Sequence, residues 1–319
     1  MGHNYLTADS QAKQNSLHHL LSSLDEIVSA VLHSIKQHTA KNLSITNSNV
    51  QGNNYTGVLT GRNNGEIINS YVEGIVNGSY YTGGLVGNNL GLIKNSGADV
   101  NVSGAWVIGG LVGNNQRDIN FSYSIGKVIA NGRVGGLAGW NSGNINESFA
   151  KGNVTATSSF GHAGGLIGQN RASVMKSYSQ GDVEGTEVIG GLVGLSEFSS
   201  SIEASYSHGN VTGNNKIGGL IGINADNSKA IESFSTGKVI GNDDIGGLVG
   251  INGASIESCY WDSDSSEMSE GTGQGLSNGI TSKTTVQMTG DAAKNNMPEF
   301  DWENIWETTT NYPILRWQR

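Results

Sequence analysis

The triplet Gly-Gly-Leu, or a close variant of it, recurs along most of this chain at a nearly constant spacing. The eight leucines of these triplets are Leu59, Leu85, Leu111, Leu137, Leu166, Leu192, Leu220 and Leu248. Consecutive leucines are 26 to 29 residues apart. A fixed period of this length indicates one structural unit stacked on the next, with small insertions absorbed in loops.

Other positions of the repeat keep the same phase as the leucines. Four residues after each leucine stand Asn63, Asn89, Asn115, Asn141, Asn170, Ser196, Asn224 and Asn252. About eleven residues after it stand Ser70, Ser96, Ser122, Ser148, Ser177, Ser205, Ser233 and Ser258. An aromatic residue usually follows the serine, at Tyr71, Tyr123, Phe149, Tyr178, Tyr206 and Phe234.

Each unit also carries about three short apolar segments, which fit three short β-strands and their turns. The 48 glycines of the chain disfavour a helical repeat, and a β-propeller blade needs roughly 40 residues. In a parallel stack each residue lies about 4.8 Å from its equivalent in the next coil. The sequence therefore predicts an all-β, parallel, right-handed β-solenoid of about eight coils.

Strand alternation predicts where the apolar columns point. We expect the leucines to line the inside and the asparagines to form a hydrogen-bonded ladder at a turn. The residues just after the leucines and three before them, such as Val193 and Ile189, would then form an apolar stripe on the outside. Either a helix of residues 14–38 covers this stripe, or the stripe mediates self-association, or a flattened coil buries both faces.

The two ends of the chain depart from the repeat. Residues 14–38 have the apolar spacing of an amphipathic helix, which would cap the solenoid or serve as an oligomerisation segment. We divide the chain into an N-terminal helix (1–40), the solenoid (41–258) and a C-terminal loop with an aromatic-rich cap (259–319). Residues 262–282 are expected to be a loop. The C-terminal aromatics Trp302, Trp306, Tyr312 and Trp317 are expected to pack as a cap, with contact to a glycan as the alternative.

Composition excludes several classes of protein. The formal net charge is −9, with no basic stripe, which argues against nucleic acid as a partner. The single cysteine, Cys259, excludes an intrachain disulfide. No apolar run is long enough for a membrane span, and residues 1–14 do not resemble a signal peptide.

The units Tyr81-Thr82-Gly83-Gly84-Leu85-Val86-Gly87-Asn88-Asn89 and 238–250 resemble GLUG-motif repeats. The segments Cys259-Tyr260-Trp261-Asp262, 283–288 and 312–317 resemble the usual end of such arrays. The resemblance covers roughly residues 43 to 319. It implies a bacterial extracellular or cell-surface setting, as in adhesins and some IgA-specific metallopeptidases, in which the repeat is usually an accessory array.

The sequence offers few groups for catalysis. Asp182 and Glu184 share a strand face, but solvated surface charge explains them better than an acid–base pair. The histidines lack metal-ligand spacing, no His-Glu-x-x-His motif occurs, and Asp262-Ser263-Asp264 lacks the full spacing of a calcium loop. We therefore predict no catalytic site, no metal and no cofactor.

These observations favour a non-enzymatic surface module, structural or adhesive, that binds a glycan or a cell-surface ligand. The first alternative is a polysaccharide-active enzyme or glycan-binding domain, because β-helices often host those. The second is an ice-binding protein, although Thr155, Thr157, Thr186 and Thr212 are too scattered to form a flat threonine column.

Overall fold

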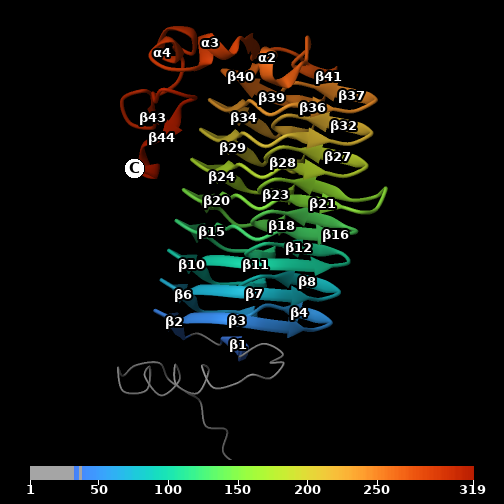
Figure 1. Cartoon of the computed structure of the whole chain (residues 1–319), viewed down its shortest axis with the longest axis vertical. Coiled ribbons are helices and arrows are strands. Elements are labelled where there is room, and N and C mark those ends of the chain that lie inside the picture. Colours follow the sequence, from blue (N-terminus) through green and yellow to red (C-terminus); the bar gives the residue numbers. More distant parts are fainter. Residues whose placement is uncertain (1–31, 36–37) are drawn as a thin grey trace, which may run out of the picture.

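The computed structural model describes residues 32–35 and 38–319, which form a parallel β-solenoid of about nine turns. The coils stack along the long axis of the molecule, and the C-terminal elements lie at one end and along one side (Figure 1). Each complete coil passes in turn through four sheets, which we name A, B, C and D. The predicted all-β, parallel architecture is confirmed, and the hand of the coil stays a prediction.

Sheets A and B hold the strands that follow each leucine. The strands of sheet A are β1 (Leu32–Ile35), β5 (Thr60–Asn63), β9 (Val86–Asn89), β13 (Val112–Asn115), β18 (Ala138–Asn141), β23 (Ile167–Asn170), β28 (Val193–Ser196), β33 (Ile221–Asn224), β38 (Val249–Asn252) and β41 (Thr272–Gly275). Those of sheet B are β2 (Thr39–Lys41), β6 (Glu66–Ile68), β10 (Leu92–Lys94), β14 (Ile119–Asn120), β19 (Ile145–Asn146), β24 (Ser173–Met175), β29 (Ser201–Glu203), β34 (Lys229–Ile231) and β39 (Ser255–Glu257). Equivalent residues pair in register, as Val112 does with Val86 and Ala138.

Sheet C begins with long strands and then divides into two files. The long strands are β3 (Ser44–Gln51), β7 (Tyr71–Asn77) and β11 (Gly97–Gly104). The first file continues as β15 (Tyr123–Ser124), β20 (Phe149–Ala150), β25 (Tyr178–Ser179), β30 (Tyr206–Ser207), β35 (Phe234–Ser235), β40 (Cys259–Asp262) and β42 (Ile280–Lys283). The second continues as β16 (Val128–Ala130), β21 (Val154–Ala156), β26 (Val183–Glu184), β31 (Val211–Thr212) and β36 (Val239–Ile240).

Sheet D closes each coil and leads into the Gly-Gly-Leu triplet. Its strands are β4 (Asn54–Thr56), β8 (Tyr80–Gly83), β12 (Val107–Gly109), β17 (Arg133–Gly135), β22 (His162–Gly164), β27 (Glu187–Gly190), β32 (Asn215–Gly218) and β37 (Asp243–Gly246).

The triplet is a corner between sheets D and A. The chain bends at Gly191 and Leu192, between β27 and β28. A side chain at Gly190 would collide with the carbonyl oxygen of Val193, and one at Gly191 with that of Gly219, so only glycine lets the corner close.

The corner corrects the prediction of an outer apolar stripe. The leucine column is buried, as predicted, and Leu192 is 0% exposed. However, Val193 and Ile189 are also 0% exposed, as are most of their equivalents in other coils. The alternation that placed them outside stops at the bend, so residues on both sides of it point into one core. Both apolar columns therefore lie inside the coil. The hypothesis of self-association through an outer apolar stripe loses its basis.

The prediction of an N-terminal helix is wrong for one part of the segment, and the rest of the segment lies outside the described residues. Leu32–Ile35 forms strand β1, whose residues Leu32 and Ile35 pair with Thr60 and Asn63 of β5. Pairing with an open sheet edge thus overrides the helical spacing of this segment. Residues 1–31 and 36–37 lie outside the described residues, and with them the proposed cap or oligomerisation segment.

The solenoid extends beyond the predicted range of 41–258 at both ends. At the N-terminal end, β1 and β2 belong to sheets A and B, and at the C-terminal end β40, β41 and β42 continue sheets C and A. The expected loop at 262–282 therefore contains coil strands. The remaining elements are α2 (Ser263–Ser266), α3 (Thr285–Met288), α4 (Ala292–Asn296), β43 (Trp306–Glu307), β44 (Ile314–Leu315) and the 3-10 helix η1 (Arg316–Gln318).

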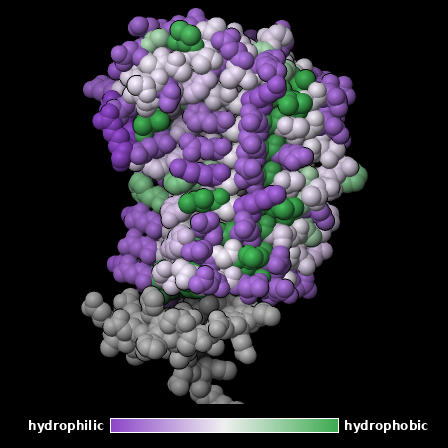
Figure 2. Space-filling view, in the orientation of Figure 1, coloured by the Kyte–Doolittle hydropathy of each residue, from purple (hydrophilic) through white to green (hydrophobic). Residues whose placement is uncertain are grey.

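The outer surface is mainly polar on the face that carries β3, β7 and β11. On this face hydrophilic side chains stand in files along the long axis, and smaller hydrophobic patches lie between them (Figure 2). The stacking therefore repeats surface chemistry along the axis as well as core packing.

Candidate functional site

The asparagine column forms the predicted ladder at the turn between sheets A and B. From Asn63 to Asn170 the amide nitrogen of one coil donates to the amide oxygen of the next, at 2.8 Å from Asn89 to Asn115 and from Asn115 to Asn141. The ladder is interrupted at Ser196, whose Oγ lies 2.7 Å from Ser200 Oγ. These amides are fully buried and bonded to one another, so they are not available to a ligand.

The serine column is a second buried ladder. The backbone N–H of Ser122 donates to Ser148 Oγ at 3.1 Å, and Ser148 Oγ donates to the carbonyl oxygen of Asn146 at 2.9 Å. The same pattern recurs from Ser70 to Ser205. These hydroxyls satisfy the hydrogen bonds of backbone groups at the entry to sheet C, so we assign them a structural role.

The aromatic column runs along the outside of sheet C. Adjacent rings from Tyr123 to Phe234 stack with centroids 5.0 to 5.2 Å apart. The C-terminal segment folds back over the far half of this column. As a result, Tyr206 and Phe234 are fully buried, whereas Phe149 and Tyr123 are half-buried.

The four C-terminal aromatics predicted as glycan contacts belong to this packed segment. Trp306 is fully buried, and its ring centroid lies 5.5 Å from that of Phe234. Trp317 lies against Phe149 and Tyr178 and donates to the carbonyl oxygen of Lys176 at 2.8 Å. The remaining two, Trp302 and Tyr312, are half-buried. These positions fit the packed cap that the sequence analysis favoured over contact with a glycan.

Asp262 holds the beginning of the C-terminal cap in place. Its Oδ1 accepts from the backbone N–H groups of Asp264 and Ser265, which caps α2. Its Oδ2 accepts from Thr285 Oγ1 at 2.7 Å and from Tyr312 Oη at 2.5 Å. The residues that faintly resembled a calcium loop are therefore a helix cap.

His208 lies half-buried between the cap and the aromatic column. Its ring centroid lies 4.6 Å from that of Tyr206 and 5.4 Å from that of Tyr312, and its Nδ1 lies 2.7 Å from Thr236 Oγ1. Burial without a charged partner lowers the pKa of His208 to about 4. The imidazole is thus held neutral in the cap interface.

The carboxylates Asp182 and Glu184 are exposed on sheet C beside a shallow hollow. Asp182 Oδ1 accepts from the backbone N–H of Asn210 at 2.9 Å, and the backbone N–H of Asp182 donates to Asn153 Oδ1. Asp182 is therefore one member of an outer ladder of side chains, and the prediction that the pair is not catalytic stays a prediction.

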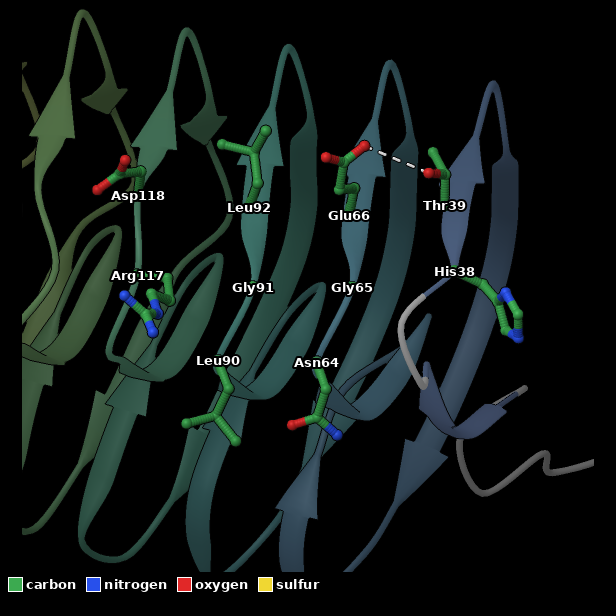
Figure 3. Close-up of a pocket in the computed structure, with 10 residues that line it drawn as sticks. All are labelled: His38, Thr39, Asn64, Gly65, Glu66, Leu90, Gly91, Leu92, Arg117 and Asp118. Atoms are coloured by element: carbon green, nitrogen blue, oxygen red, sulfur yellow. Dashed lines mark hydrogen bonds between the residues drawn. The ribbon is translucent and has the colours of Figure 1, made fainter.

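A second hollow lies along the corner between sheets A and B near the N-terminal end (Figure 3). Its carboxylates, Glu66 and Asp118, lie on either side of Leu92 in successive coils. Two coil steps separate them by roughly 10 Å. Thr39 Oγ1 donates to Glu66 at 3.2 Å, and Asn144 Nδ2 donates to Asp118 at 3.2 Å. Among the described residues that line this hollow, no acid is paired with a base.

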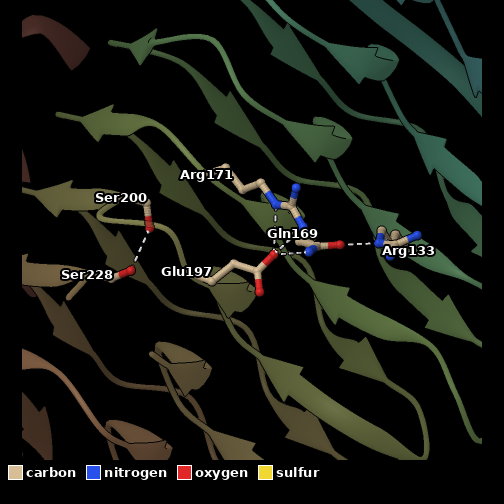
Figure 4. A network of polar contacts seen from close by, with 6 residues as sticks. All are labelled: Arg133, Gln169, Arg171, Glu197, Ser200 and Ser228. Carbon is tan, nitrogen blue, oxygen red and sulfur yellow. Dashed lines mark hydrogen bonds and ion pairs between the residues drawn. The ribbon is translucent and has the colours of Figure 1, made fainter. Parts of the chain in front are cut away.

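A guanidinium cluster lies outside the corner between sheets D and A (Figure 4). It comprises Arg133, Trp140, Gln169, Arg171, Glu197 and Phe198. Both guanidiniums, of Arg133 and Arg171, lie 4.8 Å from the centroid of the Trp140 ring. Arg171 also lies 4.3 Å from the ring of Phe198 and forms a 2.7 Å ion pair with Glu197.

Gln169 links the two sides of this cluster. It accepts from Arg133 Nε and donates to Glu197. Burial, and then the charge of Arg171, lower the pKa of the Arg133 guanidinium. Within the described part of the chain, Arg133 forms no ion pair with a carboxylate, and Glu197 is already paired with Arg171, so the cluster carries one more cation than anion.

Sequence reasoning missed the guanidinium cluster because its members do not repeat. Arg133 replaces Val107 of the previous coil, and Trp140 replaces Asn114. The sequence signal that could have found them was their position around one triplet. Arg133 stands shortly before its glycines, and Trp140 stands shortly after its leucine. Such variable positions point out of the corner.

Two further observations limit the chemistry of the described residues. Across residues 32–35 and 38–319, no group of three or more His, Cys, Asp and Glu is placed to hold a metal ion. In the same residues, no helix has the length and hydropathy of a membrane span.

Comparison with known proteins adds a fold neighbour. No family model matches the sequence, and no curated protein matches it. Among solved structures, the chain is similar to a crystal structure described as a "putative immunoglobulin A1 protease" from Bacteroides ovatus, with a TM-score of 0.54 and 16% sequence identity. The match covers 92% of this chain and 88% of that chain. At this identity the likeness shows the fold alone.

Proposed function

We propose that this chain is a non-enzymatic extracellular or cell-surface module, a rigid β-solenoid that presents a binding face. The proposal rests on the observation that the repeated polar side chains form hydrogen bonds inside the stack. The amides from Asn63 to Asn141 and the hydroxyls from Ser70 to Ser205 bond between coils and are buried. Such ladders stiffen a stack and leave the outward positions free to vary.

The surroundings of the acidic residues support the same proposal. Asp262 holds a helix and the cap, and Asp182 bonds to the next coil. The resemblance to GLUG-motif repeats supports the bacterial surface setting.

The proposal predicts that the chain turns over neither polysaccharides nor immunoglobulin A1. The purified chain, incubated with acidic and neutral polysaccharides, should release neither reducing ends nor unsaturated products, and incubation with immunoglobulin A1 should release no fragments. Asp182→Asn and Glu184→Gln are the matched variants. Turnover by the native chain that either variant abolishes would show that the exposed carboxylate pair is an active site.

A further inference from the structure

Exposed aromatic rings gather where the chain enters sheet D in three consecutive coils. Tyr55, Tyr80 and Trp106 are 42%, 45% and 51% exposed. Asn54 pairs with Tyr80, and the backbone N–H of Trp106 donates to the carbonyl oxygen of Ser79 at 3.1 Å, so successive coils place these rings along one edge. Large aromatic rings are otherwise costly to leave in water, which marks this edge as a contact surface.

A fourth ring gives the edge a rigid base. Tyr81 stacks on Tyr55 with centroids 5.3 Å apart and planes 8° apart. Both residues have positive φ, 47° for Tyr81 and 54° for Tyr55. This conformation is uncommon for an aromatic residue. The stacked pair therefore holds its two rings in a fixed orientation.

The guanidinium cluster continues this edge into the next coil. The backbone N–H of Arg133 donates to the carbonyl oxygen of Trp106 at 2.6 Å, and the Arg133 side chain stacks on Trp140. Arg171 already pairs with Glu197. Positive charge in excess thus adjoins exposed aromatic rings, in a chain whose formal net charge is −9.

Two buried atoms of the same cluster lack partners. Among the described residues, neither Trp140 Nε1 nor His162 Nδ1 has a hydrogen-bond partner, and His162 pairs with Arg133 in register. Unsatisfied buried groups are rare in folded proteins, and each one calls for an explanation such as a bound water or ligand. The corner between sheets D and A thus holds polar groups whose hydrogen bonds the neighbouring protein groups do not supply.

We propose that this surface, the aromatic–guanidinium strip (Tyr55, Tyr80, Tyr81, Trp106, Arg133 and Trp140), binds an acidic polysaccharide of low charge density. The C–H faces of sugar rings would lie on Tyr80 and Trp106, and a sugar carboxylate would pair with Arg133. The inference rests on the proposed function and names the ligand class of its binding face.

The charge pattern selects this ligand over other polymers. One surplus cation suits a chain whose carboxylates are separated by neutral sugars. Nucleic acid needs several phosphate contacts. A neutral glycan would leave Arg133 without a counter-charge. The strip also lies away from the C-terminal aromatics, which pack against Tyr206 and Phe234 instead.

The test uses hyaluronan oligosaccharides, which carry one carboxylate on every second sugar, and the same oligosaccharides after carboxyl reduction. Calorimetric titration of the full chain should show binding that weakens with salt and falls by roughly tenfold on carboxyl reduction. Trp106→Ala and Arg133→Met should each weaken binding by roughly tenfold or more. The matched controls Phe121→Ala and Arg117→Met alter an exposed ring and an exposed guanidinium elsewhere, and should bind like the native chain.

The outcomes separate the inference from the proposed function. Equal affinity for the reduced oligosaccharides would overturn the acidic class, and unchanged affinity of Trp106→Ala, folded by circular dichroism, would overturn the site. Absence of binding without turnover would overturn this inference and leave the proposed function intact. Cleavage of the oligosaccharides would overturn the proposed function itself.

Discussion

Replacing Leu192 with asparagine should lower the free energy of unfolding by about 4 kcal/mol. Leu192 is 0% exposed at the corner between β27 and β28, and Leu166 and Leu220 lie directly beside it in the adjacent coils. The substitution removes a buried apolar side chain and places an amide where its neighbours offer only hydrocarbon. Urea unfolding followed by circular dichroism measures the loss.

An exposed position of similar setting serves as the control for Leu192→Asn. Thr212 is exposed on β31, one coil further along, and Thr212→Asn should change the free energy of unfolding by less than about 0.5 kcal/mol. Equal urea midpoints for the two variants would contradict an inward leucine column.

Acidification should loosen the C-terminal cap through His208. The pKa of this histidine is about 4 in the folded chain, against the ordinary value of 6.5. Between these values the unfolded chain binds more protons, so stability falls as the pH falls from about 6.5 toward 4. At pH 4.5 the expected loss is about 2 kcal/mol for this residue. His162, whose pKa burial also lowers to about 4, adds a similar loss in the same window.

Variants separate the histidine from other acid effects. His208→Phe keeps a ring among Tyr206, Phe234 and Tyr312 but removes the titrating group. It should therefore reduce the difference between the unfolding free energies at pH 7.5 and pH 4.5 by about 2 kcal/mol. Trp306→Phe, which trims cap packing without removing a titrating group, should lower both values equally. If His208→Phe keeps the full pH dependence of the native chain, the neutral imidazole is not its source.

The repeat predicted the core well because its period is a property of the stack. Every coil needs the same corner, so Leu85 and Leu192 keep their phase and the asparagine ladder follows from it. The direction predicted for Val193 was wrong because alternation assumes an unbroken strand, whereas the chain bends within the Gly-Gly-Leu triplet. The glycines at 190 and 191 are the physical signal, since only a close approach of backbones requires both.

The ends and the proposed binding face were harder to predict, for different reasons. The strands β41 and β42 lack the triplet, so their place in the coil depends on pairing with β38 and β40. The segment of β1 has helical spacing, and an available sheet edge decides its conformation. Arg133 and Trp140 each occur once, and their proximity arises only when the corner between sheets D and A brings them together.

The central claim is that the residues on both sides of the triplet face one closed core. Maleimide labelling of an introduced cysteine at Val193 tests it most directly, with Thr212→Cys as the exposed control. The native thiol of Cys259 can remain, because it is 0% exposed and burial raises its pKa to about 12. We expect Thr212→Cys to label rapidly under native conditions and Val193→Cys to label only after urea unfolding. Labelling of Val193→Cys at the rate of the exposed control, in a folded chain, would contradict the closed core.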